Sequence, residues 1–290
     1  MLTSPQNNGL TAMDEQGVPQ PEVIRRHSLA VRLTHWINVI CLALLLMSGL
    51  AIFNAHPLLY WGHTGHRGMP FLFGIGAKSE NGRAVGVTRM AEMDFETTGV
   101  LGVSFDGDGR ALRRAFPTWL TLPSNANLAL ARDWHFLLAW LFVLNGVVYL
   151  GFGLLSGHVR RDLLPAADQL RARHIASDIW NHLRLRSPRG EADRRYNVLQ
   201  KFAYLLVVFV LLPVMVLSGL TMSPAVTAAA PFLFDLFGGR QSARTIHFIT
   251  ANLLVLFVLV HVLQVLISGV FNRMRAMVTG RYVIRPERTP

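Results

Sequence analysis

Cysteine and acidic residues are scarce in this chain of 290 residues. Cys41 is the only cysteine, which excludes an intramolecular disulfide and, within one chain, an iron–sulfur cluster or a zinc site built on several cysteines. Charged residues make up 16% of the chain, whereas soluble domains average about 25%. No short apolar run followed by a small-residue cleavage site opens the sequence, so we expect no removable signal peptide. The shortage of charge points away from a soluble globular protein.

Charge is missing altogether from four long stretches. Each contains no Asp, Glu, Lys or Arg and has at least the roughly 20 residues that cross a bilayer. The stretches are residues 33–53, 134–156, 202–221 and 246–270. We therefore expect an all-α fold, an integral membrane four-helix bundle, with Cys41 as a packing residue in the first span. Pro213 is expected to kink the third span.

The basic residues are distributed unevenly around these stretches. Three segments hold 18 of the 28 Lys and Arg, namely residues 1–32, 157–201 and 271–290. The positive-inside rule makes them a cytoplasmic N-terminal tail, a cytoplasmic loop and a cytoplasmic C-terminal tail. The transmembrane domain then covers residues 33–270, and residues 54–133 form a long extracytoplasmic loop. The basic loop is expected to contact anionic lipid head groups, so we expect membrane lipid, and no nucleic acid, as the partner of the positive charge.

The second and fourth spans resemble each other. Residues 134–157, WHFLLAWLFVLNGVVYLGFGLLSG, align without a gap on residues 246–269, IHFITANLLVLFVLVHVLQVLISG, and ten of the 24 positions are identical. The first and third spans share a shorter echo, MSGL at Met47 and LSGL at Leu217. The pattern is typical of two helical hairpins related by an axis along the membrane normal, a parallel repeat. Leucine-rich spans also align by composition alone, so both interpretations stay open.

The fourth span carries two histidines, His247 and His261. Fourteen residues of α-helix separate them by about 21 Å along the axis and leave both rings on nearly the same face. Ionisable groups in a membrane span are costly and usually have a function. His247 is expected at the same depth in the membrane as His135, which lies at the outer start of the second span. His261 matches His35, near the inner start of the first span.

Two pairs of neutral imidazoles at two depths are what two low-spin b-type haems need as axial ligands. A zinc site is disfavoured, because it would want three or four ligands at one depth and the spans contain no carboxylate. The inner pair is the less secure one, since His35 and His261 differ by about 10 Å in depth. His158, just beyond the second span, is an alternative inner ligand to His261.

These residues also carry a resemblance to a known family. The motifs RLTHWIN around His35, WHF around His135, and TIHF with LVHV around His247 and His261 resemble the bacterial cytochrome b-561 family over residues 24–280. That family includes the cytochrome b subunits of nickel–iron hydrogenases, formate dehydrogenases and thiosulfate reductases. The resemblance implies two haems b, one held by His35 and His261 and the other by His135 and His247.

Several loop segments, among them HPLLYWG and LFGGRQSARTIHF, are similar to cytochrome b subunits that work beside a periplasmic molybdopterin oxidoreductase. The resemblance thus implies an electron-transfer subunit in the bacterial inner membrane, which exchanges electrons with the quinone pool and is not a complete enzyme. Two other functions stay open. One is a haem-free transporter or scaffold, and the other is a self-contained quinol oxidase that reduces oxygen.

Overall fold

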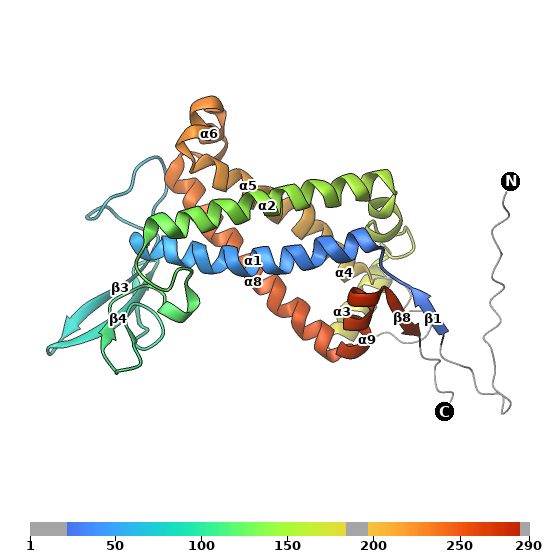
Figure 1. Cartoon of the computed structure of the whole chain (residues 1–290), viewed down its shortest axis with the longest axis horizontal. Coiled ribbons are helices and arrows are strands. Elements are labelled where there is room, and N and C mark those ends of the chain that lie inside the picture. Colours follow the sequence, from blue (N-terminus) through green and yellow to red (C-terminus); the bar gives the residue numbers. More distant parts are fainter. Residues whose placement is uncertain (1–21, 184–196, 285–290) are drawn as a thin grey trace. The chain divides into compact units, whose positions relative to one another are not determined.

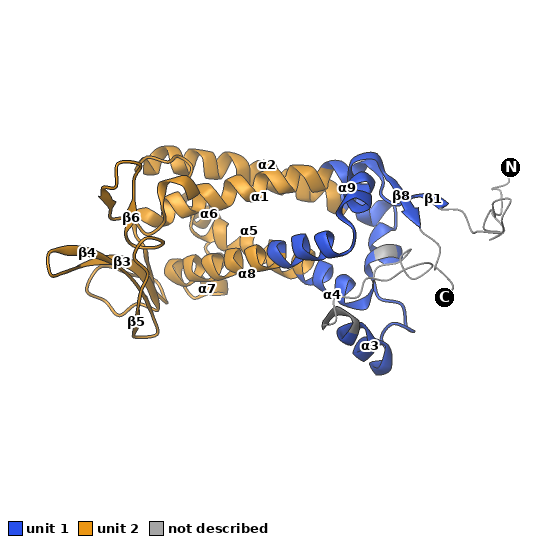
Figure 2. Ribbon diagram, turned by 90° about the horizontal axis from the view of Figure 1, so that it is seen from below, with its two compact units in different colours: residues 1–33, 151–206, 258–290 blue, residues 34–150, 207–257 orange. Residues whose placement is uncertain are grey.

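The structure is a computed structural model that describes residues 22–183 and 197–284 (Figure 1). Its elements are β1 (Glu22–Arg25), α1 (Leu29–Ala55), β2 (Leu58–Leu59), β3 (Phe73–Glu80), β4 (Arg83–Met90), β5 (Met93–Glu96), β6 (Ser104–Phe105), β7 (Ala111–Leu112), the 3₁₀ turn η1 (Thr118–Leu120), α2 (Leu128–Leu155), the π turn η2 (Val159–Leu163), α3 (Ala172–Leu183), α4 (Val198–Leu206), the π turn η4 (Val207–Leu211), α5 (Leu212–Thr221), α6 (Pro224–Ala229), α7 (Phe232–Phe237), α8 (Arg240–Ile267), α9 (Val270–Thr279) and β8 (Arg281–Ile284). The chain forms two compact units, coloured in Figure 2. Unit 1 is residues 1–33, 151–206 and 258–290, and unit 2 is residues 34–150 and 207–257.

Four helices are long and apolar enough to cross a membrane, as the charge-free stretches predicted. They are Leu29–Ala55, Leu128–Leu155, Val198–Thr221 and Arg240–Ile267. Between 11% and 22% of each apolar window is buried inside the protein, so most of the helix surface is left for lipid. The fourth helix begins at Arg240, six residues before the predicted span. A charge-free window misses such ends, because polar residues at the first turns of a helix meet the head groups.

Side-chain caps and glycines fix where these helices begin and end. Asn127 Oδ1 accepts a hydrogen bond from the Leu130 N–H at 2.9 Å, which caps α2, and Ser28 Oγ accepts one from the Val31 N–H at 3.3 Å, which caps α1. Gly269 (φ 93°) separates α8 from α9, and Gly280 (φ 82°) ends α9. Only glycine adopts these left-handed conformations without strain.

The third span is not a uniform α-helix. Its middle is the π turn η4, and α5 follows with Pro213 in its first turn. Proline has no N–H and its ring collides with the carbonyl four residues earlier. A wider turn just before Pro213 relieves that collision. At the place where Pro213 predicted a kink, the helix changes from a π turn to an α-helix.

The expectation of an all-α fold was wrong for the region between the first two spans. Residues 58–96 form an antiparallel sheet in the order β2-β3-β4-β5, and β6 pairs with β7. Asn81 (φ 49°) and Gly82 (φ 75°) form the two-residue turn between β3 and β4. An Asn-Gly pair is the strongest short-range hairpin signal, because both positions need positive φ. This signal stands in the sequence and predicts the hairpin.

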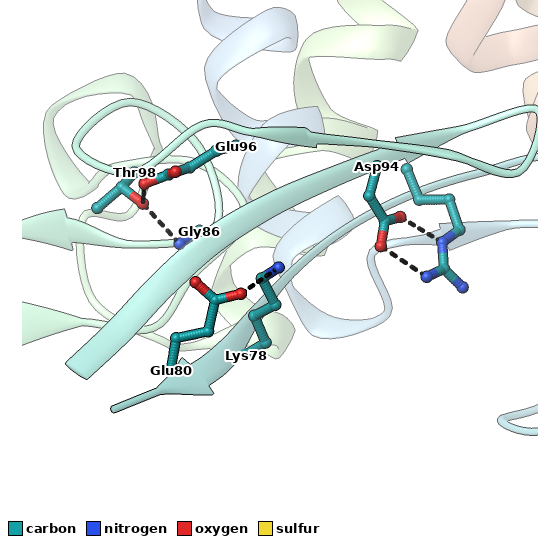
Figure 3. Close-up of polar contacts among 7 residues, drawn as sticks. Lys78, Glu80, Gly86, Asp94, Glu96 and Thr98 are labelled. Carbon is teal, nitrogen blue, oxygen red and sulfur yellow. Dashed lines mark hydrogen bonds and ion pairs between the residues drawn. The ribbon is translucent and has the colours of Figure 1, made fainter. Parts of the chain in front are cut away.

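Polar contacts join the strands of this sheet (Figure 3). Arg89 on β4 makes two parallel hydrogen bonds to Asp94 on β5, at 2.5 and 2.8 Å. These bonds lower the pKa of Asp94. Thr98 Oγ1 accepts a hydrogen bond from the Gly86 N–H at 3.0 Å and donates one to Glu96 at 3.1 Å. Beneath the sheet, an apolar core made by Phe53, Leu59, Ile75 and Ala115 packs against Phe73, Leu101, Phe116 and Phe248.

Within unit 1, the two predicted polar tails are partly folded. β1, from the N-terminal tail, pairs antiparallel with β8, from the C-terminal tail. One face of this ribbon buries Tyr282 and Ile284 against Ala276 of α9. Asn272 on α9 donates to the Val283 carbonyl at 2.8 Å and accepts from the Val283 N–H at 3.0 Å. Residues 1–21, 184–196 and 285–290 of the predicted tails and basic loop lie outside the described residues.

Candidate metal centre

The structure brings His135 and His247 together in unit 2. His135 lies on α2, and His247 lies on α8 one turn after Arg244. Their ring centroids are 6.3 Å apart, and the ring planes make an angle of 63°. The apolar stretches that hold them, residues 134–156 and 246–270, contain no Asp or Glu, and Asp133, two residues before His135 on α2, is exposed. The two half-buried imidazoles therefore lie close together with no carboxylate from these stretches beside them.

A buried serine contacts each ring from the neighbouring span. Ser48 Oγ on α1 lies 3.0 Å from His135 Nδ1, and Ser218 Oγ on α5 lies 3.1 Å from His247 Nδ1. Each hydroxyl also donates to the carbonyl four residues earlier, at 2.8 Å from Ser48 and 2.6 Å from Ser218. A hydroxyl has only one hydrogen. A hydroxyl whose hydrogen goes to the carbonyl accepts the hydrogen bond from Nδ1–H of its histidine.

Backbone carbonyls support the same tautomer. The Met215 carbonyl lies 3.0 Å from His247 Nδ1, and the Leu45 carbonyl is the backbone hydrogen-bond partner of His135. Both carbonyls come three residues before the serine of their helix. A carbonyl can only accept, so Nδ1 is the protonated nitrogen of both rings. Each Nε2 then keeps a free lone pair.

A glycine follows each serine and makes room for the ring. A Cβ atom at Gly49 would lie 3.5 Å from His135 Cε1, and one at Gly219 would lie 3.3 Å from His247 Cε1. Any side chain larger than a methyl group would push the ring away from the helix backbone. The same Ser-Gly pair thus supports equivalent histidines in both hairpins, which supports the internal repeat.

This arrangement would suit one metal ion held between the two imidazoles. Two metal–nitrogen bonds would be about 2 Å long each, and each nitrogen lies about 1 Å from the centroid of its ring. Together they give a separation of about 6 Å between the two ring centroids. The observed 6.3 Å agrees with this value. Two neutral imidazoles on opposite sides of an iron, with an apolar surrounding, are the ligand set of a bis-histidine haem. The residues present therefore fit a b-type haem.

His35 lies on α1 in unit 2, beside a polar clamp between α1 and α2. The buried Asn145 of α2 donates to the Thr34 carbonyl at 2.9 Å and to Asn38 Oδ1 at 2.7 Å. The His35 ring meets the Trp36 ring edge-on, with centroids 5.4 Å apart. The clamp fixes the backbone next to His35 against the second span.

His261 and His158 lie in unit 1, and His35 lies in unit 2. His261 is on α8, and the His158 ring is 6.5 Å from the Phe152 ring. The pairing of His35 with His261, and the alternative with His158, therefore stay predictions.

Near His247 lies a half-buried cationic group, Arg244, that the sequence did not single out. Arg244 donates to the Leu58 carbonyl at 2.9 Å and also to the His56 carbonyl, which holds the end of the first span to α8. Burial lowers the pKa of His56, and the guanidinium groups of Arg244 and Arg67 lower it further. His56 is therefore a neutral imidazole at pH 7.

Ser48, Ser218 and Arg244 were missed as site residues. The MSGL and LSGL echo contained the two serines, and it marked a repeat without indicating what they contact. Nothing in the sequence signals the Arg244 contacts, because they go to backbone carbonyls far along the chain.

Two comparisons relate the chain to known proteins. The family model of the prokaryotic cytochrome b561 matches residues 26–280. A protein of Azospira oryzae, whose name reads "Putative protein-methionine-sulfoxide reductase subunit YedZ1", is 29% identical over 244 residues, which are 84% of this chain and 91% of that protein. No solved structure matches the chain.

Proposed function

The chain belongs to the prokaryotic cytochrome b561 family, and we propose that it is a di-haem cytochrome b that carries electrons between the quinone pool and a partner oxidoreductase. The observation that carries the proposal is the His135–His247 pair, with its 6.3 Å ring separation and a serine on each Nδ1. The protein is in this view an electron-transfer subunit and not a complete enzyme.

His135 and His247 would hold the outer haem b, and His35 and His261 the inner one. Haem, when bound, would supply one-electron redox chemistry at these two places. Ser48 and Ser218 hold the two rings by Nδ1 and so would leave Nε2 of His135 and His247 to bind the metal. The apolar helices exclude water and counter-ions from the path.

The proposed partner is a periplasmic oxidoreductase of the molybdopterin type, on the resemblance of the loop segments. The name of the Azospira oryzae relative makes reduction of protein methionine sulfoxide the first reaction to test. We propose the bacterial inner membrane as the location, with both termini in the cytoplasm. This orientation follows from the 18 basic residues in the tails and the middle loop.

An absorbance spectrum of the purified protein tests this function. We expect a Soret band, a split alpha band after reduction by dithionite, and two haems per chain. Absence of a Soret band would leave a haem-free transporter or scaffold. Oxygen uptake with a quinol and no partner would instead favour a self-contained quinol oxidase.

The inner ligand is tested by two matched variants. We expect His261→Ala to lose the inner haem and keep the outer one, and His158→Ala to keep both. The haem content of each variant, from the pyridine haemochrome spectrum, distinguishes them. Retention of both haems in His261→Ala would transfer the inner ligand to His158.

A further inference from the structure

A concentration of positive charge lies in unit 1, on the ribbon of β1 and β8 and on α9, where Glu22 of β1 is the one acidic residue. Residues 270–284 contain no Asp or Glu and three arginines, Arg273, Arg275 and Arg281. The exposed Arg25 of β1 lies directly opposite the exposed Arg281 of β8. Like charges at directly opposed positions of an antiparallel pair destabilise the pair. A bound anion would remove that cost.

A hollow of about 460 Å³ opens on this face of the ribbon, lined by Val23, Arg275, Thr279 and Arg281. One nitrogen of Arg275 donates to Asn272 Oδ1 at 2.9 Å, which orients its guanidinium group. Guanidinium groups are the preferred partners of phosphate oxygens, because their N–H groups match the spacing of two oxygens. The hollow therefore combines two arginines with one apolar side chain, Val23.

The exposed face of α9 is apolar next to this hollow. Phe271, Met274 and Val278 are 89%, 40% and 62% exposed. Their spacing of three and four residues puts them on one stripe, and Arg275 follows the same side of the helix. The opposite face is the one that buries Ala276 against the ribbon. An apolar stripe flanked by arginines is typical of a helix that lies in the head-group layer of a membrane.

The position of α9 in the chain agrees with that location. It begins three residues after the end of α8, beyond the turn at Gly269. The last turns of α8 in this unit expose Leu259, Leu263 and Leu266, the surface expected of a helix in lipid. The apolar stripe on α9 thus continues the exposed leucine surface of α8, which we expect to lie in lipid.

We propose that this face binds one anionic phospholipid, whose phosphate lies between Arg275 and Arg281 and whose acyl chains lie along Phe271, Met274 and Val278. The site goes beyond the proposed electron transfer and does not involve the haems. A free phosphate ion has the same chemistry as the phosphate of the head group, but it has no acyl chains to contact the apolar stripe.

Titration of the delipidated full-length protein in a neutral detergent tests the site. Phosphatidylglycerol, phosphatidylcholine and inorganic phosphate are added separately, and binding is measured as the rise in the thermal unfolding midpoint. We expect only phosphatidylglycerol to stabilise the protein. Each arginine near an anionic head group contributes about fivefold in affinity, so R275Q/R281Q is expected to bind about 25-fold more weakly.

Two further variants complete the test. R110Q removes an equally exposed arginine from unit 2 and is expected to bind phosphatidylglycerol as the unchanged protein does. Phe271→Ser with Val278→Ser is expected to weaken binding of the lipid without changing the response to phosphate. The unfolding midpoint without lipid and the haem spectrum show that each variant is folded.

Two results would overturn the proposal. One is that inorganic phosphate stabilises the protein as well as phosphatidylglycerol does and the Phe271/Val278 variant behaves normally, which would mean a free-anion site. The other is equal stabilisation of R275Q/R281Q and the unchanged protein. Loss of the Soret band in the unchanged protein would instead contradict the proposed function and leave the lipid result unaffected.

Discussion

The first hairpin, α1 with α2, and the second hairpin, the third span with α8, differ in almost everything except how they support a histidine. In the first, residues 56–127 between the helices contain a sheet. In the second, residues 222–239 contain two short helices, α6 and α7. α1 is one continuous helix, whereas the third span changes to a π turn before Pro213.

Despite these differences, His135 and His247 make the same contacts. Each Nδ1 meets a serine hydroxyl and the carbonyl three residues before that serine, and each Cε1 lies against a glycine. The connections between the helices differ, yet the contacts of the proposed metal ligands, which come from the neighbouring helix, stay the same. We conclude that the constraint on this bundle lies in the Ser-Gly pairs and the histidines together.

The largest expected effect comes from removing either member of the histidine pair. His247→Ala and His135→Ala should each reduce the haem content from two to one per chain, because one imidazole cannot hold a six-coordinate low-spin iron. Haem content and the low-spin signal in electron paramagnetic resonance measure this. Unequal loss would show that the two hairpins are not equivalent. Full haem content in both variants would refute the site.

A smaller effect is expected from the serines. Ser48→Ala or Ser218→Ala removes an acceptor from Nδ1–H, which weakens the imidazole as a donor to ferric iron. We expect the outer haem midpoint potential to rise by up to about 59 mV, a tenfold change in the one-electron equilibrium.

The matched control for the serines is Thr221→Val. Thr221 is buried on the same helix as Ser218 and its hydroxyl bonds the carbonyl four residues earlier, at 2.8 Å. The Thr221→Val variant should leave the midpoint potential of the outer haem unchanged. A shift in Thr221→Val as large as in Ser218→Ala would mean that loss of any buried hydroxyl accounts for the effect.

Alanine substitutions at the two glycines should change the stability of the protein differently in the two hairpins. A methyl group at Gly49 makes an ordinary contact at 3.5 Å, so Gly49→Ala should stabilise the helix by up to about 1 kcal/mol through its better helix propensity. The closer 3.3 Å contact at Gly219 forces the His247 ring to move, so Gly219→Ala should lose that gain. Thermal unfolding of the two variants checks the order, and a more stable Gly219→Ala would contradict it.

The smallest effect concerns pH and only the first hairpin, in which His56 directly follows the end of α1. The pKa of His56 is lowered in the folded protein by burial and by Arg244 and Arg67. The unfolded chain, with a histidine pKa near about 6.5, binds the proton more readily. The free energy of unfolding should therefore decrease as pH falls below that value. His56→Gln should flatten this decrease in a pH series of thermal unfolding, and an unchanged slope would exclude His56 as its source.

The apolar spans could be predicted from sequence because lipid requires long runs without charge. The depth argument also paired His135 with His247, which lie together in the structure. The sheet was not predicted, because hydrophobic length identifies membrane spans and does not identify short strands, whose signal is the local turn at Asn81 and Gly82. The roles of Ser48 and Ser218 could not be predicted, since they depend on which face of one helix meets the next. The pairing of His35 with His261 stays a prediction.

Cys41 lies fully buried in α1 and has no exposed sulfur. Thiols react as thiolates with access to solvent, and a proposed electron carrier works beside an oxidising compartment. Because the only thiol of the chain is buried, oxidants meet no accessible sulfur atom that could compete for the electrons. Electrons that enter the bundle therefore cannot be lost through disulfide exchange. A cysteine introduced at any exposed position would be the sole reactive thiol of the protein.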